Sequence, residues 1–293
     1  MMTDTTDILK RVRKIEIKTR GLSRQFFSGQ YHSVFKGRGM AFSEVREYQY
    51  GDDIRNIDWN VTARFNHPYI KVFEEERELT VMLLIDVSGS TDFGTVSVLK
   101  KDLITEIAAV LSFSAIQNND KVGIVFFSDR IEKFIPPKKG RSHILRIIRE
   151  LISFKPESQA TDIAEAMRFL TNALKKRAVV FLFSDFLGEG YEDAIRIANQ
   201  KHDLIAVQIK DQREVRLPSI GLLRIKDAET GKQRWLDTSL KRVREAHANW
   251  HRQQQDKLVT AMAKAGVDLV QMQTGEDYVR PLINLFKRRE MRT

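Results

Sequence analysis

The segment Leu79-Thr80-Val81-Met82-Leu83-Leu84-Ile85-Asp86-Val87-Ser88-Gly89-Ser90 decides the fold class. Its first part is a nearly continuous apolar run that ends at Asp86. Such a run is typical of a parallel strand that helices cover on both faces, because neither side of that strand meets water. The segment therefore predicts a buried strand over residues 79–86 and a polar loop directly after it.

Short apolar runs continue to alternate with helical periodicity until about Leu285. We expect strands over 79–86, 121–127, 178–184, 203–209 and 267–272, and helices over 96–117, 141–153, 162–177, 190–201 and 240–265. Two hairpins are also expected, with 131–135 paired to 121–127 and 222–226 paired to 233–237. This pattern predicts an α/β fold with a doubly wound, mainly parallel, Rossmann-like sheet of strand order 3-2-1-4-5-6 and helices on both faces.

Residues 1–78 have a different character. A basic helix is expected near 4–20, and the following residues are rich in Gly, Tyr, Phe and charge without a sustained period. We therefore expect a smaller N-terminal module over 1–78 and the α/β domain over 79–293.

Composition excludes several classes of protein. With 42% hydrophobic and 30% charged residues, the 293-residue chain is not disordered in bulk. The longest apolar runs fall far short of the roughly 18 residues that a membrane span requires, and the start Met1-Met2-Thr3-Asp4 does not resemble a secretory signal. We expect no membrane span and a cytoplasmic location. The absence of cysteine excludes disulfides and thiolate metal sites.

The net charge of +10 raises the question of an acidic partner. The basic excess gathers at the chain ends, at Lys10, Arg11, Arg13, Lys14, Lys18, Arg20, Arg24, Lys287, Arg288, Arg289 and Arg292. We favour solvated helix faces over a nucleic-acid surface, because no aromatic residues are interleaved with these charges.

Oxygen-bearing side chains follow the ends of the expected strands. Asp86, Ser88 and Ser90 form a D-x-S-x-S pattern, Thr161 stands at the start of the 162–177 helix, and Asp185 follows the strand 178–184. In an open parallel sheet these loops meet at one edge. Each residue alone is explained as a turn or cap residue, but the set suits a hard divalent cation, Mg²⁺ or Mn²⁺.

The sequence gives less support to a catalytic site than to a metal-binding site. Ser88 occupies the position of the second acid in hydrolases that begin with a D-x-D nucleophile motif. The segment Ser88-Gly89-Ser90 also lacks the G-x-S-x-G elbow. His247 and His251 are four residues apart on an expected helix, and we interpret them as surface histidines. We expect a protein that is not an enzyme. A metal-dependent phosphoesterase and nucleic-acid binding through the basic ends remain as alternatives.

The D-x-S-x-S pattern with a later Thr161 and Asp185 resembles the metal-ion-dependent adhesion site of von Willebrand factor A domains. This resemblance implies that an Asp or Glu of a protein partner completes the coordination of the metal.

A further set of motifs resembles the bacterial family known as the fifty-eighth domain of unknown function. The motifs are Gly37-Arg38-Gly39, Glu44-Val45-Arg46-Glu47-Tyr48, Gly51-Asp52-Asp53-Ile54-Arg55, Ile57-Asp58-Trp59, Ala63-Arg64, Lys71 and Asp227-Ala228-Glu229-Thr230-Gly231. The resemblance implies a MoxR-type AAA+ ATPase as partner. The chain departs from the family pattern at Gln212, where proline is common, and at Gln159-Ala160, where glycine is frequent.

The segment Gly51–Trp59 has two interpretations. Its acids Asp52, Asp53 and Asp58 are either a second acidic site or turn residues paired with arginines, Arg55 and Arg64, around a core Trp59. We favour the structural interpretation.

Overall fold

A computed structural model describes residues 10, 12–16, 18, 41–74, 78–92, 99–226 and 232–292. The chain divides into two compact units, a smaller one over 35–79 and a larger one that begins at Thr80. The larger unit also includes the described residues before position 34. Arg141 pairs with Glu16 at 2.6 Å, and Lys18 pairs with Glu106 at 2.6 Å. The full extent of the expected 1–78 module stays a prediction.

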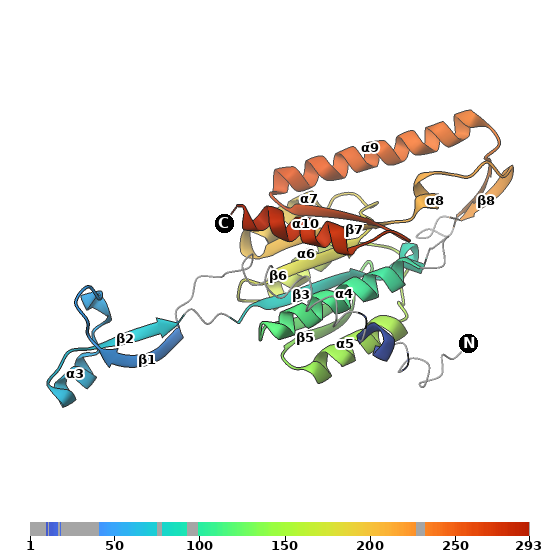
Figure 1. Ribbon diagram of the computed structural model, residues 1–293. Helices are drawn as coiled ribbons and strands as arrows, with labels where there is room; N and C mark the ends of the chain where they lie inside the picture. Colours follow the sequence, from blue (N-terminus) through green and yellow to red (C-terminus); the bar gives the residue numbers. More distant parts are fainter. Residues whose placement is uncertain are drawn as a thin grey trace. The chain divides into compact units, whose positions relative to one another are not determined.

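The larger unit is built on a six-stranded sheet of order β10-β7-β6-β3-β4-β5 (Figure 1). Its strands are β3 (Thr80–Asp86), β4 (Lys121–Phe127), β5 (Ile131–Lys138), β6 (Val179–Ser184), β7 (Asp203–Lys210) and β10 (Asp268–Gln273). Neighbouring strands are parallel, except that β5 pairs antiparallel with β4. Counted along the chain, this order is the predicted 3-2-1-4-5-6, so the doubly wound α/β fold is confirmed.

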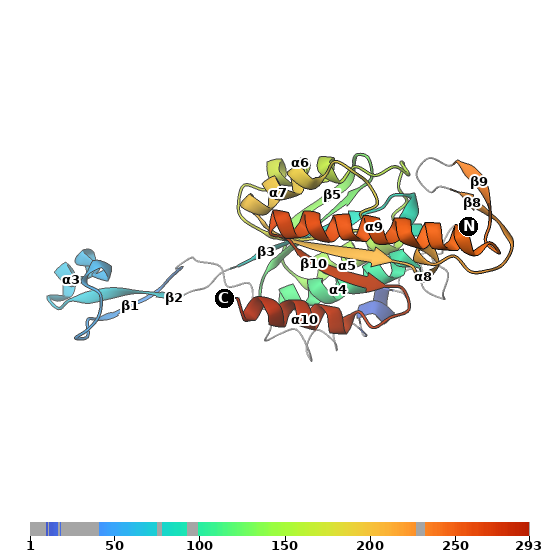
Figure 2. The same ribbon diagram turned by 90° about the horizontal axis from the view of Figure 1, so that it is seen from above.

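Helices cover both faces of the sheet, with α4, α5 and α10 on one side and α6, α7 and α9 on the other (Figure 2). They are α4 (Lys100–Gln117), α5 (Arg141–Ser153), α6 (Ile163–Ala173), α7 (Glu192–Lys201), α9 (Lys241–Ala265) and α10 (Val279–Glu290). A one-turn helix, α8 (Gln212–Val215), follows β7 and precedes the hairpin of β8 (Leu222–Lys226) and β9 (Gln233–Asp237). The D-x-E-T-G turn expected in this hairpin lies outside the described residues.

Burial explains why the strands lack an alternating pattern. All residues of β6 are buried, and so are all of β3 after Thr80. Leu84 and Leu182 join the core cluster with Met167 of α6 and Ile195 of α7, so one face of the sheet packs on these helices. Apolar side chains are therefore required on both faces of the central strands.

Two helix predictions need correction. The predicted 162–177 helix ends at Ala173, because Leu174 adopts an extended backbone and the next three residues are exposed. The helix α10 was not predicted, although its buried Leu282, Leu285 and Phe286 have helical spacing. None of the helices in the described ranges is both long and apolar enough to cross a membrane.

The smaller unit contains the antiparallel pair β1 (Ala41–Glu47) and β2 (Tyr69–Glu74), a 3₁₀ turn η2 (Ile54–Asn56) and the helix α3 (Trp59–Phe65). Its acids have structural partners. Asp52 forms a bidentate ion pair with Arg46 at 2.8 and 2.9 Å, Asp53 caps η2, and Asp58 caps α3.

These contacts favour the structural interpretation of the 51–59 segment, with two corrections. The arginine that pairs with an acid is Arg46, where Arg55 and Arg64 were expected. Trp59 is 70% exposed and does not belong to a core.

Candidate metal centre

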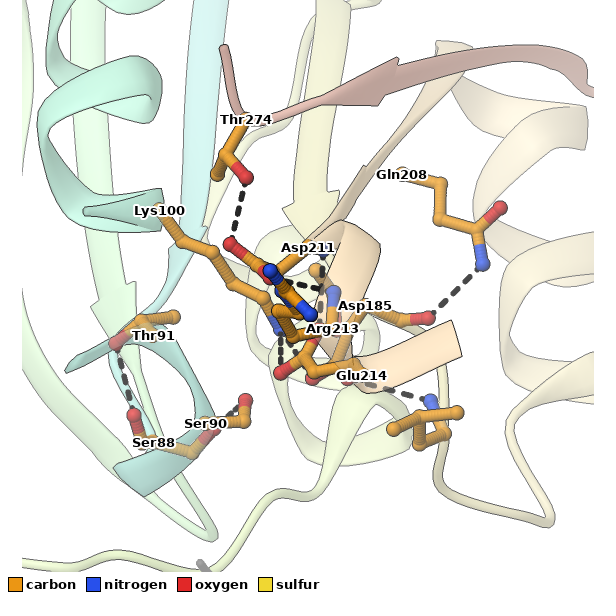
Figure 3. A network of polar contacts seen from close by, with 12 residues as sticks. Ser88, Ser90, Thr91, Lys100, Asp185, Gln208, Asp211, Arg213, Glu214 and Thr274 are labelled. Atoms are coloured by element: carbon orange, nitrogen blue, oxygen red, sulfur yellow. Dashed lines mark hydrogen bonds and ion pairs between the residues drawn. The ribbon is translucent and has the colours of Figure 1, made fainter. Parts of the chain in front are cut away.

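The loop after β3 is folded around Asp86, which is 1% exposed. Asp86 Oδ1 accepts a hydrogen bond from the backbone N–H of Ser88 at 3.0 Å, which closes a tight turn at the strand end. The hydroxyls of Ser88 and Ser90 lie 3.2 Å apart, and Thr91 Oγ1 donates to the Ser88 carbonyl at 2.8 Å (Figure 3). The three oxygen-bearing residues of the D-x-S-x-S pattern therefore form one compact turn.

A serine on the neighbouring strand holds the other oxygen of Asp86. Ser184, the last residue of β6, is 1% exposed and its Oγ donates to Asp86 Oδ2 at 2.7 Å. The same Oγ accepts from the backbone N–H of Phe186 at 3.1 Å. Because β3 and β6 are parallel neighbours, their carboxyl ends meet here, as predicted.

The carboxylates of Asp86 and Asp185 influence one another. Burial raises the pKa of Asp86 above its usual value, and the negative charge of Asp185 raises this pKa further. The hydrogen bonds from Ser184 and Ser88 act in the opposite direction. A cation between the two carboxylates would offset both the burial and the repulsion.

Asp185 faces an internal cation. Its side chain is 11% exposed, and its Oδ2 lies 3.5 Å from Nζ of Lys100 in α4. Lys100 is 1% exposed, and its Nζ lies 2.6 Å from Oε1 of Glu214 in α8 (Figure 3). Burial raises the pKa of Glu214, and the charge of Lys100 lowers it. Asp185 Oδ2 is buried and accepts no hydrogen bond from the described residues.

The predicted donor Thr161 lies in a loop that contacts this edge through the neighbouring Gln159. Its loop reaches the turn after β3, because the Gly89 N–H donates to the Gln159 carbonyl at 3.0 Å. Asp162 caps α6, accepting from the Glu165 N–H at 2.9 Å. The Thr161 hydroxyl itself makes no hydrogen bond with the described residues.

The donors at this edge fit a hard divalent cation. Two carboxylates and several hydroxyls are the all-oxygen set that Mg²⁺ and Mn²⁺ prefer, and Asp185 Oδ2 has an unused lone pair. Among the residues that the structure describes, no three carboxylate or imidazole groups converge on one point. A cation here would thus depend on hydroxyl and outside ligands beside the two aspartates.

Three residues at or beside the candidate metal centre were not predicted from the sequence. Ser184 had a local signal, because it is a polar residue inside a fully buried strand next to Asp185. Lys100 and Glu214 had none, since their pairing joins helices 114 positions apart. The buried ion pair beside Asp185 is visible only in the folded chain.

The interpretation of His247 and His251 as surface histidines is wrong. His247 Nε2 lies 2.7 Å from the Glu214 carbonyl, and the two imidazole rings are 4.6 Å apart. Both rings are partly buried, and burial lowers the pKa of His251 to about 4. His247 joins α9 to α8 through its contact with the Glu214 carbonyl.

The sheet order and the D-x-S-x-S turn at its switch point define an α/β protein of the von Willebrand factor A-like class. The chain belongs to the family described as "Protein of unknown function DUF58", whose model matches residues 44–257.

A curated relative and two solved structures are similar to this chain. The uncharacterized protein Rv1480 of Mycobacterium tuberculosis is 28% identical over 96% of this chain and 89% of its own. The hypothetical protein BatB of Bacteroides thetaiotaomicron is 16% identical, with a TM-score of 0.48 over 73% of this chain and 100% of its own. An aerotolerance-related membrane protein of Bacteroides fragilis is also 16% identical, with a TM-score of 0.49 over the same shares.

Proposed function

We propose that this chain is a metal-dependent protein-binding module. Its cation, Mg²⁺ or Mn²⁺, would be held by oxygen atoms of Asp86, Ser88, Ser90, Thr161 and Asp185, and an Asp or Glu of a partner would complete the coordination. The observation that carries the proposal is the pair of carboxylates at the ends of β3 and β6. Asp185 Oδ2 is buried 3.5 Å from Lys100 Nζ and accepts no hydrogen bond from the described residues.

The local contacts favour binding over catalysis. The hydroxyl of Ser184 donates to Asp86, and the hydroxyls of Ser88 and Ser90 lie 3.2 Å apart, close enough for one cation to bind both. No hydroxyl among the described residues of this edge is hydrogen-bonded to a histidine, so an activated nucleophile of the serine–histidine type has no support here. A bound cation would therefore serve as a docking point, with no bond broken.

The partner proposed is a MoxR-type AAA+ ATPase, as the family resemblance implies. The sequence contains no P-loop, so ATP hydrolysis would belong to that partner. In such a pair this chain would act as an adaptor or in chaperone-like assembly.

The test is a binding measurement with the MoxR-type ATPase of the same genome. We expect association in Mg²⁺ that is lost in chelator and lost in Asp86→Asn and Ser88→Ala. The control is Asp162→Asn, which keeps the α6 cap and is not one of the proposed metal-binding residues. Binding that persists in chelator would contradict the proposal. So would turnover of p-nitrophenyl phosphate that Asp86→Asn removes, which would favour a phosphoesterase.

A further inference from the structure

A cavity of about 250 Å³ lies beside the candidate metal centre. Its lining residues come from the loop after β6, from β7, from α8 and the residue after it, and from α9. Those that bear on the argument are Gln208, Lys210, Arg216, Arg252 and Gln255. Asp185 also borders the cavity, so it lies between the metal centre and this space, which we call the side pocket.

Two amide side chains in the side pocket have an unused polar atom. Gln208 is 4% exposed, and its Nε2 donates to the Asp185 carbonyl at 3.1 Å (Figure 3). Gln255 Oε1 accepts from Lys210 Nζ. These bonds orient both amides and leave Gln208 Oε1 and Gln255 Nε2 buried without a partner among the described residues. Because a buried polar atom without a partner is unfavourable, the Gln208 oxygen is available as an acceptor and the Gln255 nitrogen as a donor to a ligand.

The uncompensated charge of the side pocket is positive. Arg216 and Arg252 are exposed at its wall and form no ion pair with the described residues. Lys210 adds a third cation, and burial lowers its pKa, as expected for an ammonium without a carboxylate partner. The two acids of the lining, Asp185 and Glu214, already face Lys100. The pocket therefore favours an anion.

We propose that the side pocket binds a second acidic residue of the partner segment whose first acidic residue reaches the metal. This inference rests on the proposed function. A peptide group supplies the donor for Gln208 Oε1 and the acceptor for Gln255 Nε2, and the side-chain carboxylate pairs with Arg216 and Arg252. Because Asp185 separates the two sites, one extended acidic segment reaches both.

The experiment uses the full chain and the probe N-acetyl-L-glutamate amide, which carries one carboxylate between two peptide groups. Binding is followed by NMR titration in buffer freed of metal with a chelating resin, because EDTA is itself a polycarboxylate. We expect saturable binding, and about tenfold weaker binding of the neutral match N-acetyl-L-glutamine amide.

Substitutions separate the side pocket from the metal centre. Arg216→Gln and Arg252→Gln should each weaken binding of the acidic probe about tenfold. Arg242→Gln, an exposed position of α9 outside the lining, makes the same charge change and should leave binding unaltered. All of these titrations are made in metal-free buffer, so binding of the probe does not depend on a cation at the metal centre.

The outcomes distinguish the two proposals. Equal binding of the acidic and neutral probes, no saturable binding, or equal effects of Arg242→Gln and Arg252→Gln would overturn the side pocket. Binding of the probe with these arginines required, but with no Mg²⁺-dependent partner association, would uphold the side pocket and contradict the metal-dependent function. Mg²⁺-dependent association that is insensitive to both lining arginines would uphold the metal-dependent function and overturn the side pocket.

Discussion

Ser184 Oγ donates a 2.7 Å hydrogen bond to Asp86 Oδ2 across the boundary between β6 and β3. This contact joins the two strands at the point where the chain order of the sheet reverses, and it fixes one oxygen of a carboxylate that is only 1% exposed. The other oxygen of Asp86 accepts from the Ser88 N–H, so both oxygens of this carboxylate have a hydrogen-bond partner.

The first prediction concerns the metal. Mg²⁺ should raise the melting temperature of the wild-type protein by a few degrees, because a ligand at 100 times its Kd stabilises a folded protein by about 2.7 kcal/mol. Asp86→Asn should remove this increase, whereas Asp162→Asn should keep it. Differential scanning fluorimetry with and without Mg²⁺ measures the effect, and an equal increase in Asp86→Asn would place the cation elsewhere.

The second prediction concerns the internal cation. Lys100→Met leaves Asp185 and Glu214 facing one another without a counter-charge, and breaking a buried ion pair in this way costs about 3–5 kcal/mol. The same variant should gain a larger stabilisation from Mg²⁺ than the wild type, because the charge that repels a metal near Asp185 is removed.

Urea unfolding with and without Mg²⁺ measures both effects of Lys100→Met. The double variant Lys100→Met/Glu214→Gln should recover part of the stability, because one of the two unpaired carboxylates is neutralised. If Lys100→Met unfolds in the same urea concentration as the wild type, the ion pair does not stabilise the fold.

The strands were predictable because burial on both faces leaves a continuous apolar signature. The limits of β4, β8 and β9 match the expected ranges, and the strand order follows from the alternation with helices. The helix α10 carried a readable i, i+3, i+4 pattern at Leu282, Leu285 and Phe286 that was missed.

The candidate site was predictable only where its residues follow strands. Asp86 and Asp185 lie at strand ends, so topology alone brings them to one edge. Lys100 of α4 and Glu214 of α8 form an ion pair across 114 positions of the chain, which no local pattern encodes. For the same reason Trp59 was expected in a core, since an aromatic residue in sequence does not reveal whether a neighbouring surface covers it.

The third prediction concerns the basic C-terminal end, where solvated charges were expected. Arg289 instead bridges Asp203 of β7 at 2.7 and 2.9 Å and Asp268 of β10 at 2.7 Å, and its side chain is only 12% exposed. Arg289→Met should lower the free energy of unfolding by about 2–3 kcal/mol, because Asp203 loses its arginine partner and Asp268 keeps only the exposed Arg292.

Arg292→Met is the matched control for this position. Arg292 also contacts Asp268, at 3.1 Å, but it is 68% exposed, so its removal should cost less than about 1 kcal/mol. Chemical denaturation of the two variants measures the difference. Equal losses in the free energy of unfolding would show that burial of the Arg289 ion pairs does not add to the stability of the fold.

The last prediction concerns acid stability and His202. This residue is fully buried after α7, and neither ring nitrogen has a hydrogen-bond partner among the described residues. Burial lowers its pKa from 6.5 to about 4, and the charges of Lys201 and Arg177 act in the same direction. Above pH 6.5 the ring is neutral in both folded and unfolded chains, so it makes no pH-dependent contribution there. As the pH falls from 6.5 towards 4, His202 becomes protonated in the unfolded chain but stays neutral in the folded chain. The free energy of unfolding should therefore fall by up to about 3 kcal/mol over this interval.

The variant His202→Leu tests this expectation. It replaces the imidazole with an apolar side chain of similar size and should lose this pH-dependent component. Because every other titrating group is common to both proteins, the test is the difference between their unfolding free energies at pH 7.5 and pH 4.5. A difference that does not change with pH would show that His202 is protonated equally easily in the folded chain.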